Sequence, residues 1–109
     1  MENINGINFL STKIALDAQG IKDLVFEIKS ATENVFLVFG TLSDGKVNLT
    51  VALSEQLVKD KGFDAAKIVR DLATDIQGGG GGQAFFATAG GKKPDGLDKA
   101  LARARNFIL

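Results

Sequence analysis

The 109-residue chain has 45% hydrophobic and 24% charged residues, which is typical of a single globular domain with one core. It contains neither cysteine nor histidine, which excludes disulfides, the usual zinc-binding sets and histidine-based acid–base catalysis. Its 13 basic and 13 acidic side chains cancel, which taken alone argues against a dedicated nucleic-acid binder, and no apolar segment approaches the length of a membrane span. We therefore expect a cytoplasmic protein with no membrane partner.

The first third of the chain predicts a strand followed by a helix. Residues 1–8 are mostly polar and predict a partly disordered lead-in to a single domain at 9–109. The segment NFLSTKIAL predicts the first strand, and Asp17 is suited to cap the helix that follows. Helical spacing gives this helix one apolar face, made of Ile21, Leu24, Val25 and Ile28.

The centre of the chain predicts a β-hairpin. Residues 35–42, VFLVFGTL, are almost continuously apolar, as in a strand covered on both faces of a sheet. Asp44-Gly45 between two strand patterns is a strong hairpin signal. The return strand alternates, with Val47, Leu49, Val51 and Leu53 expected inside and Asn48, Thr50 and Ala52 outside.

The second half predicts two more helices around a run of glycines. SEQLVKDKG predicts a short helical turn and loop, and Asp64 is expected to cap a helix that Gly78 ends. The five glycines at 78–82 predict a glycine-rich loop that enters a strand, AFFATA, with Phe85 and Phe86 on opposite faces. Asp95 is expected to cap the last helix, whose inner face is Leu97, Ala100, Leu101, Ala104 and Ile108.

The order of these elements predicts an α/β (α+β) fold. We expect a mixed β-sheet with a central hairpin, three helices packed against it, and the glycine-rich loop between the second helix and the last strand. The pattern does not determine the order of the strands.

The glycine run does not match the known phosphate-binding loops. Gly91 is followed by Lys92 and Lys93 instead of the Lys-Ser/Thr of a nucleotide-binding P-loop, and the required upstream glycine position holds Phe86. No three glycines have the spacing of a dinucleotide fingerprint, because Gln83 and the residues after it interrupt the pattern. A flexible connector remains an alternative for this run.

The charges are distributed unevenly along the neutral chain. Residues 1–91 carry 8 basic and 11 acidic side chains, whereas residues 92–109 carry 5 basic and 2 acidic ones. A local group of cations beside a glycine-rich segment can attract phosphate even when the whole chain is neutral. The candidate residues for contact with phosphate, and with RNA as the resemblance described below implies, are Lys92, Lys93, Lys99, Arg103, Gln83, Gly79, Gly80, Gly81 and Gly82. Lys99 and Arg103 equally suit a solvated helix face, and Gln83 equally suits a hydrogen bond to its own loop.

Residues 67–108, KIVRDLATDIQGGGGGQAFFATAGGKKPDGLDKALARARNFI, resemble the end of bacterial alanyl-tRNA synthetases. The matching residues are Gly78 to Gly82, Ala87, Gly90, Gly91, Leu97, Ala100 and Leu101. The resemblance extends over nearly all of residues 9–109 and identifies a C-Ala domain, which is related to the domain that accompanies the DHH phosphoesterases. Many members have Arg-Pro where this chain has Gln83-Ala84.

The resemblance implies a non-catalytic fragment of a larger enzyme. That enzyme, alanine–tRNA ligase, uses ATP with Mg and has a Zn-dependent editing domain, whereas the fragment itself needs no cofactor. The implied function is binding of tRNA(Ala) at its outer corner, in partnership with the catalytic and editing domains of the parent chain.

Two alternatives stay open beside this interpretation. One is a structural or dimerisation domain of the same enzyme, which would form a homodimer and touch RNA little. The other is a nucleotide-binding accessory domain of a DHH phosphoesterase, although such domains typically place a histidine beside their glycine pair and this chain has none.

Overall fold

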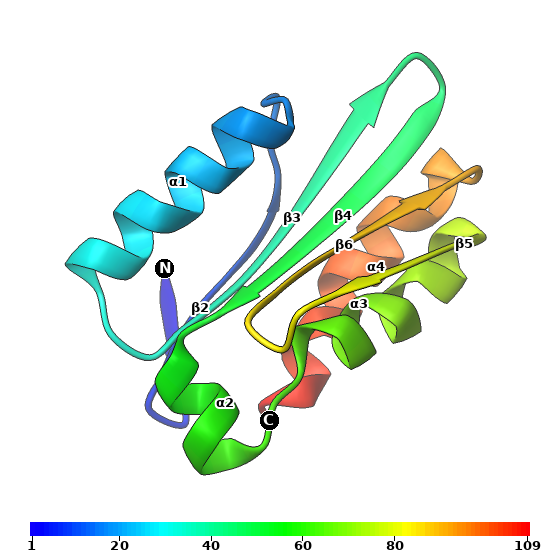
Figure 1. The fold of residues 1–109 in the computed structure, drawn as a ribbon. Coiled ribbons are helices and arrows are strands. Elements are labelled where there is room, and N and C mark those ends of the chain that lie inside the picture. Colours follow the sequence, from blue (N-terminus) through cyan, green and yellow to red (C-terminus); the bar gives the residue numbers. More distant parts are fainter.

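Six strands form one mixed sheet with helices on both of its faces in the computed structural model, which describes residues 1–109 (Figure 1). The strands are β1 (Glu2–Ile4), β2 (Ile7–Lys13), β3 (Val35–Ser43), β4 (Lys46–Leu53), β5 (Gly78–Gly82) and β6 (Phe86–Gly91). The helices are α1 (Ala18–Ala31), α2 (Glu55–Lys61), α3 (Ala65–Ala73) and α4 (Leu97–Arg103). Short 3-10 turns cover Thr74–Ile76, Pro94–Gly96 and Ala104–Phe107. No helix has the length and hydrophobicity needed to cross a membrane.

The strand order is β1-β2-β3-β4-β6-β5, so the predicted hairpin β3–β4 lies at the centre of the sheet. Only β2 and β3 are parallel, and α1 makes the crossover between them. Asp44 and Gly45 both have positive φ, at 52° and 76°, which is the backbone of a tight two-residue hairpin turn. The predicted α+β class and central hairpin are confirmed, with four helices in place of three because residues 55–61 form a complete short helix.

Two hydrophobic cores lie on opposite faces of the sheet. The larger one packs α3 and α4 against the sheet, and the smaller one lies under α1, which Figure 1 shows on the other face. As predicted, the apolar strand β3 is covered on both sides, and Val35 to Val38 are fully buried. Ala52 and Thr50 were expected outside, and this was wrong: both are buried, because the second face of β4 is covered as well.

Two of the three predicted helix caps are confirmed. The Asp17 carboxylate accepts a hydrogen bond from the Gly20 N–H, and the Asp64 carboxylate accepts from the first turn of α3. Asp95 does not cap α4, because Pro94 to Gly96 form a 3-10 turn and Gly96 takes the N-cap position. The helix before the glycines also ends earlier than predicted, at Ala73.

The first eight residues form β1, a tight turn and the beginning of β2, where the sequence predicted a partly disordered lead-in. The turn at Asn5-Gly6 has positive φ at both residues. The Asn5 amide donates a hydrogen bond to the Ile108 carbonyl at 2.8 Å, and the Arg105 guanidinium pairs with Glu2 at 2.6 Å. The N-terminal strand is therefore fastened to the last turn of the chain.

The glycine run is an edge strand, and the prediction of a loop was wrong. β5 pairs with β6 over its full length, in the register that places Gly80 opposite Ala89. A Cβ atom at Gly80 would overlap the Thr88 carbonyl oxygen, and one at Gly82 would lie 2.6 Å from the Phe86 carbonyl oxygen. A Cβ at Gly79 would meet nothing within 4 Å. The glycines at alternate positions are therefore required by the close approach of β5 to β6.

This packing predicts a large effect for one and a small effect for the other of two neighbouring alanine substitutions. Gly80→Ala should lower the free energy of unfolding by about 2 kcal/mol or more, because backbone must move to admit the methyl group. Gly79→Ala should change it by less than about 1 kcal/mol, since the site is open. Urea denaturation followed by circular dichroism measures both, and equal stabilities of the two variants would contradict the assigned role of the alternate glycines.

Candidate nucleic-acid interface

The β5–β6 hairpin separates the predicted site residues into two groups. Gln83 lies in the tight turn, where its N–H donates to the Phe86 carbonyl at 2.9 Å. Lys92 and Lys93 follow the far end of β6, about 16 Å away at the usual rise per strand residue. The structure therefore does not bring Gln83 together with these lysines.

Lys92 and Lys93 lie at one end of the sheet on a fixed backbone. Both of their N–H groups donate to the Ile76 carbonyl, at 3.0 and 2.9 Å. Lys46 lies beside them, because β4 and β6 pair up to Val47 opposite Gly91. All three side chains are exposed and none forms an ion pair, so this group, which we call the lysine end, offers three free ammonium groups.

Arg103 is committed to contacts inside the protein. Its Nε donates to Asp75 Oδ2 at 2.7 Å, and its two Nη atoms donate to the side chain and carbonyl of Asp71 at 3.3 and 3.0 Å. The hydrogen bond to Asp75 is the main reason why the pKa of Arg103 is raised. Lys99 Nζ also lies 3.8 Å from Asp75, although this lysine is mostly exposed. The arginine thus fastens α4 to the turn that precedes β5.

Arg70 is a cation that the sequence analysis missed. It is exposed, lies on α3, and donates from Nε to the Gly80 carbonyl at 3.3 Å. Its Nη2 lies 3.3 Å from the place where a Cβ at Gly81 would be. It has no carboxylate partner. The only sequence signal was its place on the polar side of a predicted helix, and the contact depends on how α3 packs against β5.

The outer edge of β5 carries backbone groups that β6 does not use. Gln83 and Phe86 exchange both of their hydrogen bonds, so by antiparallel alternation Gly81 and Gly79 bond to β6 as well. The N–H groups of Gly80 and Gly82 therefore point towards the free edge, beside the Arg70 guanidinium. Outward N–H groups next to a guanidinium are suited to hold an anionic oxygen such as that of a phosphate.

The two phenylalanines of this hairpin are neither fully buried nor fully exposed. Phe86 is half-buried and packs on the smaller core under α1. Phe85 lies in the turn with 37% of its surface exposed, and Lys29 Nζ lies 5.3 Å from its ring centroid. One of the pair packs on a core, as expected, while the other meets a lysine.

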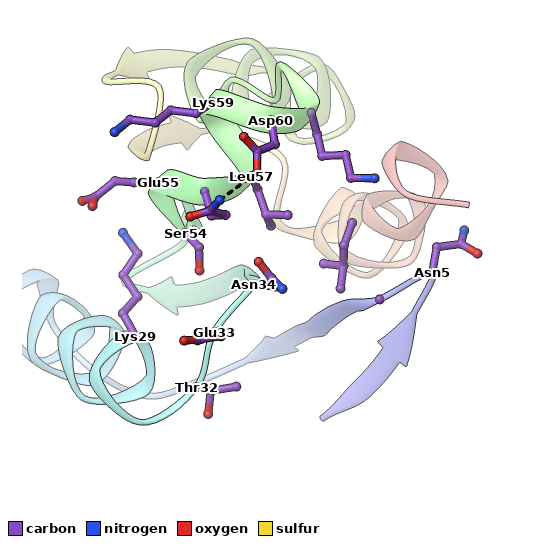
Figure 2. Close-up of a pocket in the computed structure, with 14 residues that line it drawn as sticks. Asn5, Lys29, Thr32, Glu33, Asn34, Ser54, Glu55, Leu57, Lys59 and Asp60 are labelled. Carbon is purple, nitrogen blue, oxygen red and sulfur yellow. Dashed lines mark hydrogen bonds between the residues drawn. The ribbon is translucent and has the colours of Figure 1, made fainter.

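A recess of about 860 Å³ is drawn in Figure 2. Its lining includes Asn34, which precedes β3, and Ser54, which follows β4, so it lies at the opposite end of the sheet from the lysine end. Its charged lining has both signs: Lys29, Lys59, Lys61, Glu33, Glu55 and Asp60. In Figure 2 the Lys29 side chain points towards Ser54 and Glu55. Burial lowers the pKa of Lys29, and Glu55 acts in the opposite direction. Because cations and carboxylates alternate here, this recess is a poor phosphate site, and none of the predicted residues lines it.

The contacts of Arg103 predict a structural effect on substitution. Arg103→Met should lower the free energy of unfolding by about 1–3 kcal/mol, because it leaves the Asp75 carboxylate, only 9% exposed, without its main partner. The matched control is Arg105→Met, whose ion pair with Glu2 is about half exposed, and it should cost less than about 1 kcal/mol. Thermal and urea unfolding compare the two, and an Arg103 variant as stable as the control would contradict this role.

The chain is similar in sequence, over nearly its whole length, to part of alanine–tRNA ligases. The chain is 54% identical over 108 residues to the alanine–tRNA ligase of Christiangramia forsetii and 36% identical over 109 residues to that of Halalkalibacterium halodurans. Each match covers 99% of this chain but 12% of the relative, so the chain spans about an eighth of the length of these ligases.

The solved structures give the same result for the fold. The C-Ala domain of Aquifex aeolicus alanyl-tRNA synthetase superposes with a TM-score of 0.81 at 20% identity, covering 98% of this chain and 96% of that one. The predicted resemblance to the C-terminal domain of alanyl-tRNA synthetases is thus confirmed. The model of the DHHA1 domain matches residues 6–109, and the chain belongs to that family.

Proposed function

We propose that the chain is the tRNA-binding module of a cytoplasmic alanine–tRNA ligase. In this role it binds the outer corner of tRNA(Ala) and helps the aminoacylation and editing domains of the parent chain act on the same tRNA. The parent enzyme joins alanine to tRNA with ATP and Mg, and its editing domain uses Zn. Support comes from the similarity to alanine–tRNA ligases over nearly the whole chain.

The observation that carries the proposal is an exposed edge without side chains, flanked by free cations. Along β5, nothing projects from the backbone to keep a phosphate away, and Gly79 borders open space. Arg70 lies along this edge, and the lysine end begins where Gly78 pairs with Gly91. These four cations have no carboxylate partner in the chain, so their charge is available to RNA phosphates.

A dimerisation domain is the rival that the same edge favours. A strand with unpaired N–H and C=O groups can pair with a second copy of the chain. The Arg70 side chain, however, lies across this edge and occupies the Gly80 carbonyl that such pairing would need. This contact favours the RNA-binding role over a homodimer through β5.

The lysine end predicts a salt-dependent contribution to RNA binding. The chain should bind tRNA(Ala) with log K falling against log salt at a slope of about −2 to −4, and Lys92→Ala with Lys93→Ala should make the slope shallower by roughly 1.5. The matched control removes two lysines at the other end of the sheet, Lys59→Ala with Lys61→Ala, and should keep the slope. Fluorescence anisotropy across a potassium chloride series measures binding by the wild-type chain and by both double variants. Absence of binding by the wild-type chain at low salt would contradict the proposal.

The position of Arg70 predicts that this residue contributes separately to the affinity for tRNA(Ala). Arg70→Ala should weaken binding of tRNA(Ala) by about three- to tenfold, while leaving the free energy of unfolding nearly unchanged because the side chain is exposed. Arg70→Lys keeps the charge but not the planar fork, and should restore only part of the affinity. Anisotropy and urea unfolding of both variants check this, and wild-type affinity in Arg70→Ala would remove the β5 edge from the interface.

A further inference from the structure

A second recess, of about 510 Å³, lies on the α1 face of the sheet. It is bounded by the N-terminal half of α1, by the segment from Ile14 to Asp17 that precedes it, and by the adjoining parts of β3, β4 and β6. We call it the threonine groove, after the residues of its floor. None of the predicted site residues lines it.

The floor of the groove is a group of polar side chains with no partner in the protein. Thr41 lies directly opposite Asn48, and Thr50 lies directly opposite Thr88, in the registers of β3–β4 and β4–β6. None of these four side chains makes a hydrogen bond within the chain. Thr41 and Thr50 are nevertheless only 9% and 4% exposed, and they are the chain's two buried polar residues.

No buried side-chain oxygen or nitrogen of the chain lacks a hydrogen-bond partner, so the hydroxyls of Thr41 and Thr50, which make no hydrogen bond within the protein, are accessible to solvent although most of each residue is buried. In this structure the small exposed part of each side chain faces the groove, since both residues line it. A ligand that enters the groove therefore meets a set of donors and acceptors already in place. Three threonine hydroxyls can each donate and accept, and the Asn48 amide can do both at once.

The walls of the groove are apolar. Leu16 and Leu42 are 42% and 53% exposed, which is unusual for leucine beside an open recess, and Ile14 and Phe86 also contribute. Apolar walls above a hydrogen-bonding floor fit a flat ring that has apolar faces and polar edges. Nucleobases have this chemistry, and unpaired bases of RNA are recognised in this way.

The charges around the groove agree with an RNA ligand. Lys22 lines the groove, and Lys46, of the lysine end, lies two residues before Asn48 on β4. Asp17, the acidic side chain in the lining, is engaged with the Gly20 N–H at 2.8 Å. A base in the groove would thus leave its sugar–phosphate near two ammonium groups.

We propose that the threonine groove binds an unpaired nucleobase of the RNA, with Thr50, Thr88 and Asn48 as its hydrogen-bonding partners. The proposal rests on the RNA-binding function above and assigns to it a site for a base, distinct from the phosphate contacts of β5 and the lysine end. An apolar peptide or a lipid chain would fill the walls but leave the floor unpaired. A free metal ion would find no cluster of carboxylates here.

The first test removes single hydroxyl groups without changing shape. Thr50→Val and Thr88→Val should each weaken binding of tRNA(Ala) by about three- to tenfold, as expected for one hydrogen bond. The slope of log K against log salt should stay unchanged, since no cation is removed. Thr12→Val is the matched control, because Thr12 is a strand threonine outside the groove whose hydroxyl contacts the Lys13 carbonyl. Urea unfolding shows whether each variant is folded.

The second test does not depend on tRNA. Uncharged nucleosides at millimolar concentration, titrated into the ¹⁵N-labelled chain, should shift the amide signals of Thr41, Asn48, Thr50 and Thr88, and Thr88→Val should reduce these shifts. If nucleosides shift these signals but tRNA(Ala) does not bind, the proposal of a base-binding groove is supported and the proposed tRNA function is contradicted. If tRNA binds equally well to wild type and both valine variants and nucleosides leave these signals in place, the groove proposal is overturned and the phosphate contacts remain.

Discussion

The pairing of β5 with β6 is the constraint on which the rest of this structure depends. Backbone comes so close to backbone there that alternate positions of β5 admit no side chain. The same closeness continues at the end of β6 and after it, where a Cβ at Gly91 would overlap the Ile76 carbonyl and one at Gly96 would overlap that of Asp75. The turn at Thr74–Ile76 is thus enclosed between the end of β6 and the beginning of α4, and Arg103 fastens it through Asp75. Glycines and one arginine together determine where the last helix lies.

Local patterns in the sequence were sufficient for most of the fold. The Asp44-Gly45 turn, the caps at Asp17 and Asp64, and the apolar strand at 35–42 each follow from short-range rules, and the structure confirms all of them. The glycine strand could not be found in this way. Glycine has little intrinsic preference for strands, and β5 forms because it pairs with β6 and lies against α3, which is a tertiary effect. Ala52 and Thr50 were misplaced for a related reason, because alternation cannot reveal that α1 covers the second face.

The candidate site was predictable only in part. Charge counting located Lys92 and Lys93, whose exposure at the end of the sheet agrees with the expectation. It could not separate them from Arg103, because the partners of that arginine, Asp71 and Asp75, lie 32 and 28 residues away in the chain. Arg70 and the threonine groove depend on contacts between elements that are distant in sequence. A neutral chain can therefore carry exposed lysines at one end of its sheet while Arg103 is held by carboxylates inside the protein.

A strand made of glycine alone also has a consequence for how it meets a ligand. Its outer edge repeats the same backbone N–H and C=O groups every two residues, about 7 Å apart, and the contact of Arg70 with the Gly80 carbonyl distinguishes one repeat from the others. A partner held only by this edge can move along it by one repeat and recover equivalent hydrogen bonds. The backbone of β5 therefore fixes the direction of such a partner but not its register along the strand. The register is set by the groups that do not repeat, which are the guanidinium of Arg70 along the edge of β5 and the lysines where the strand begins.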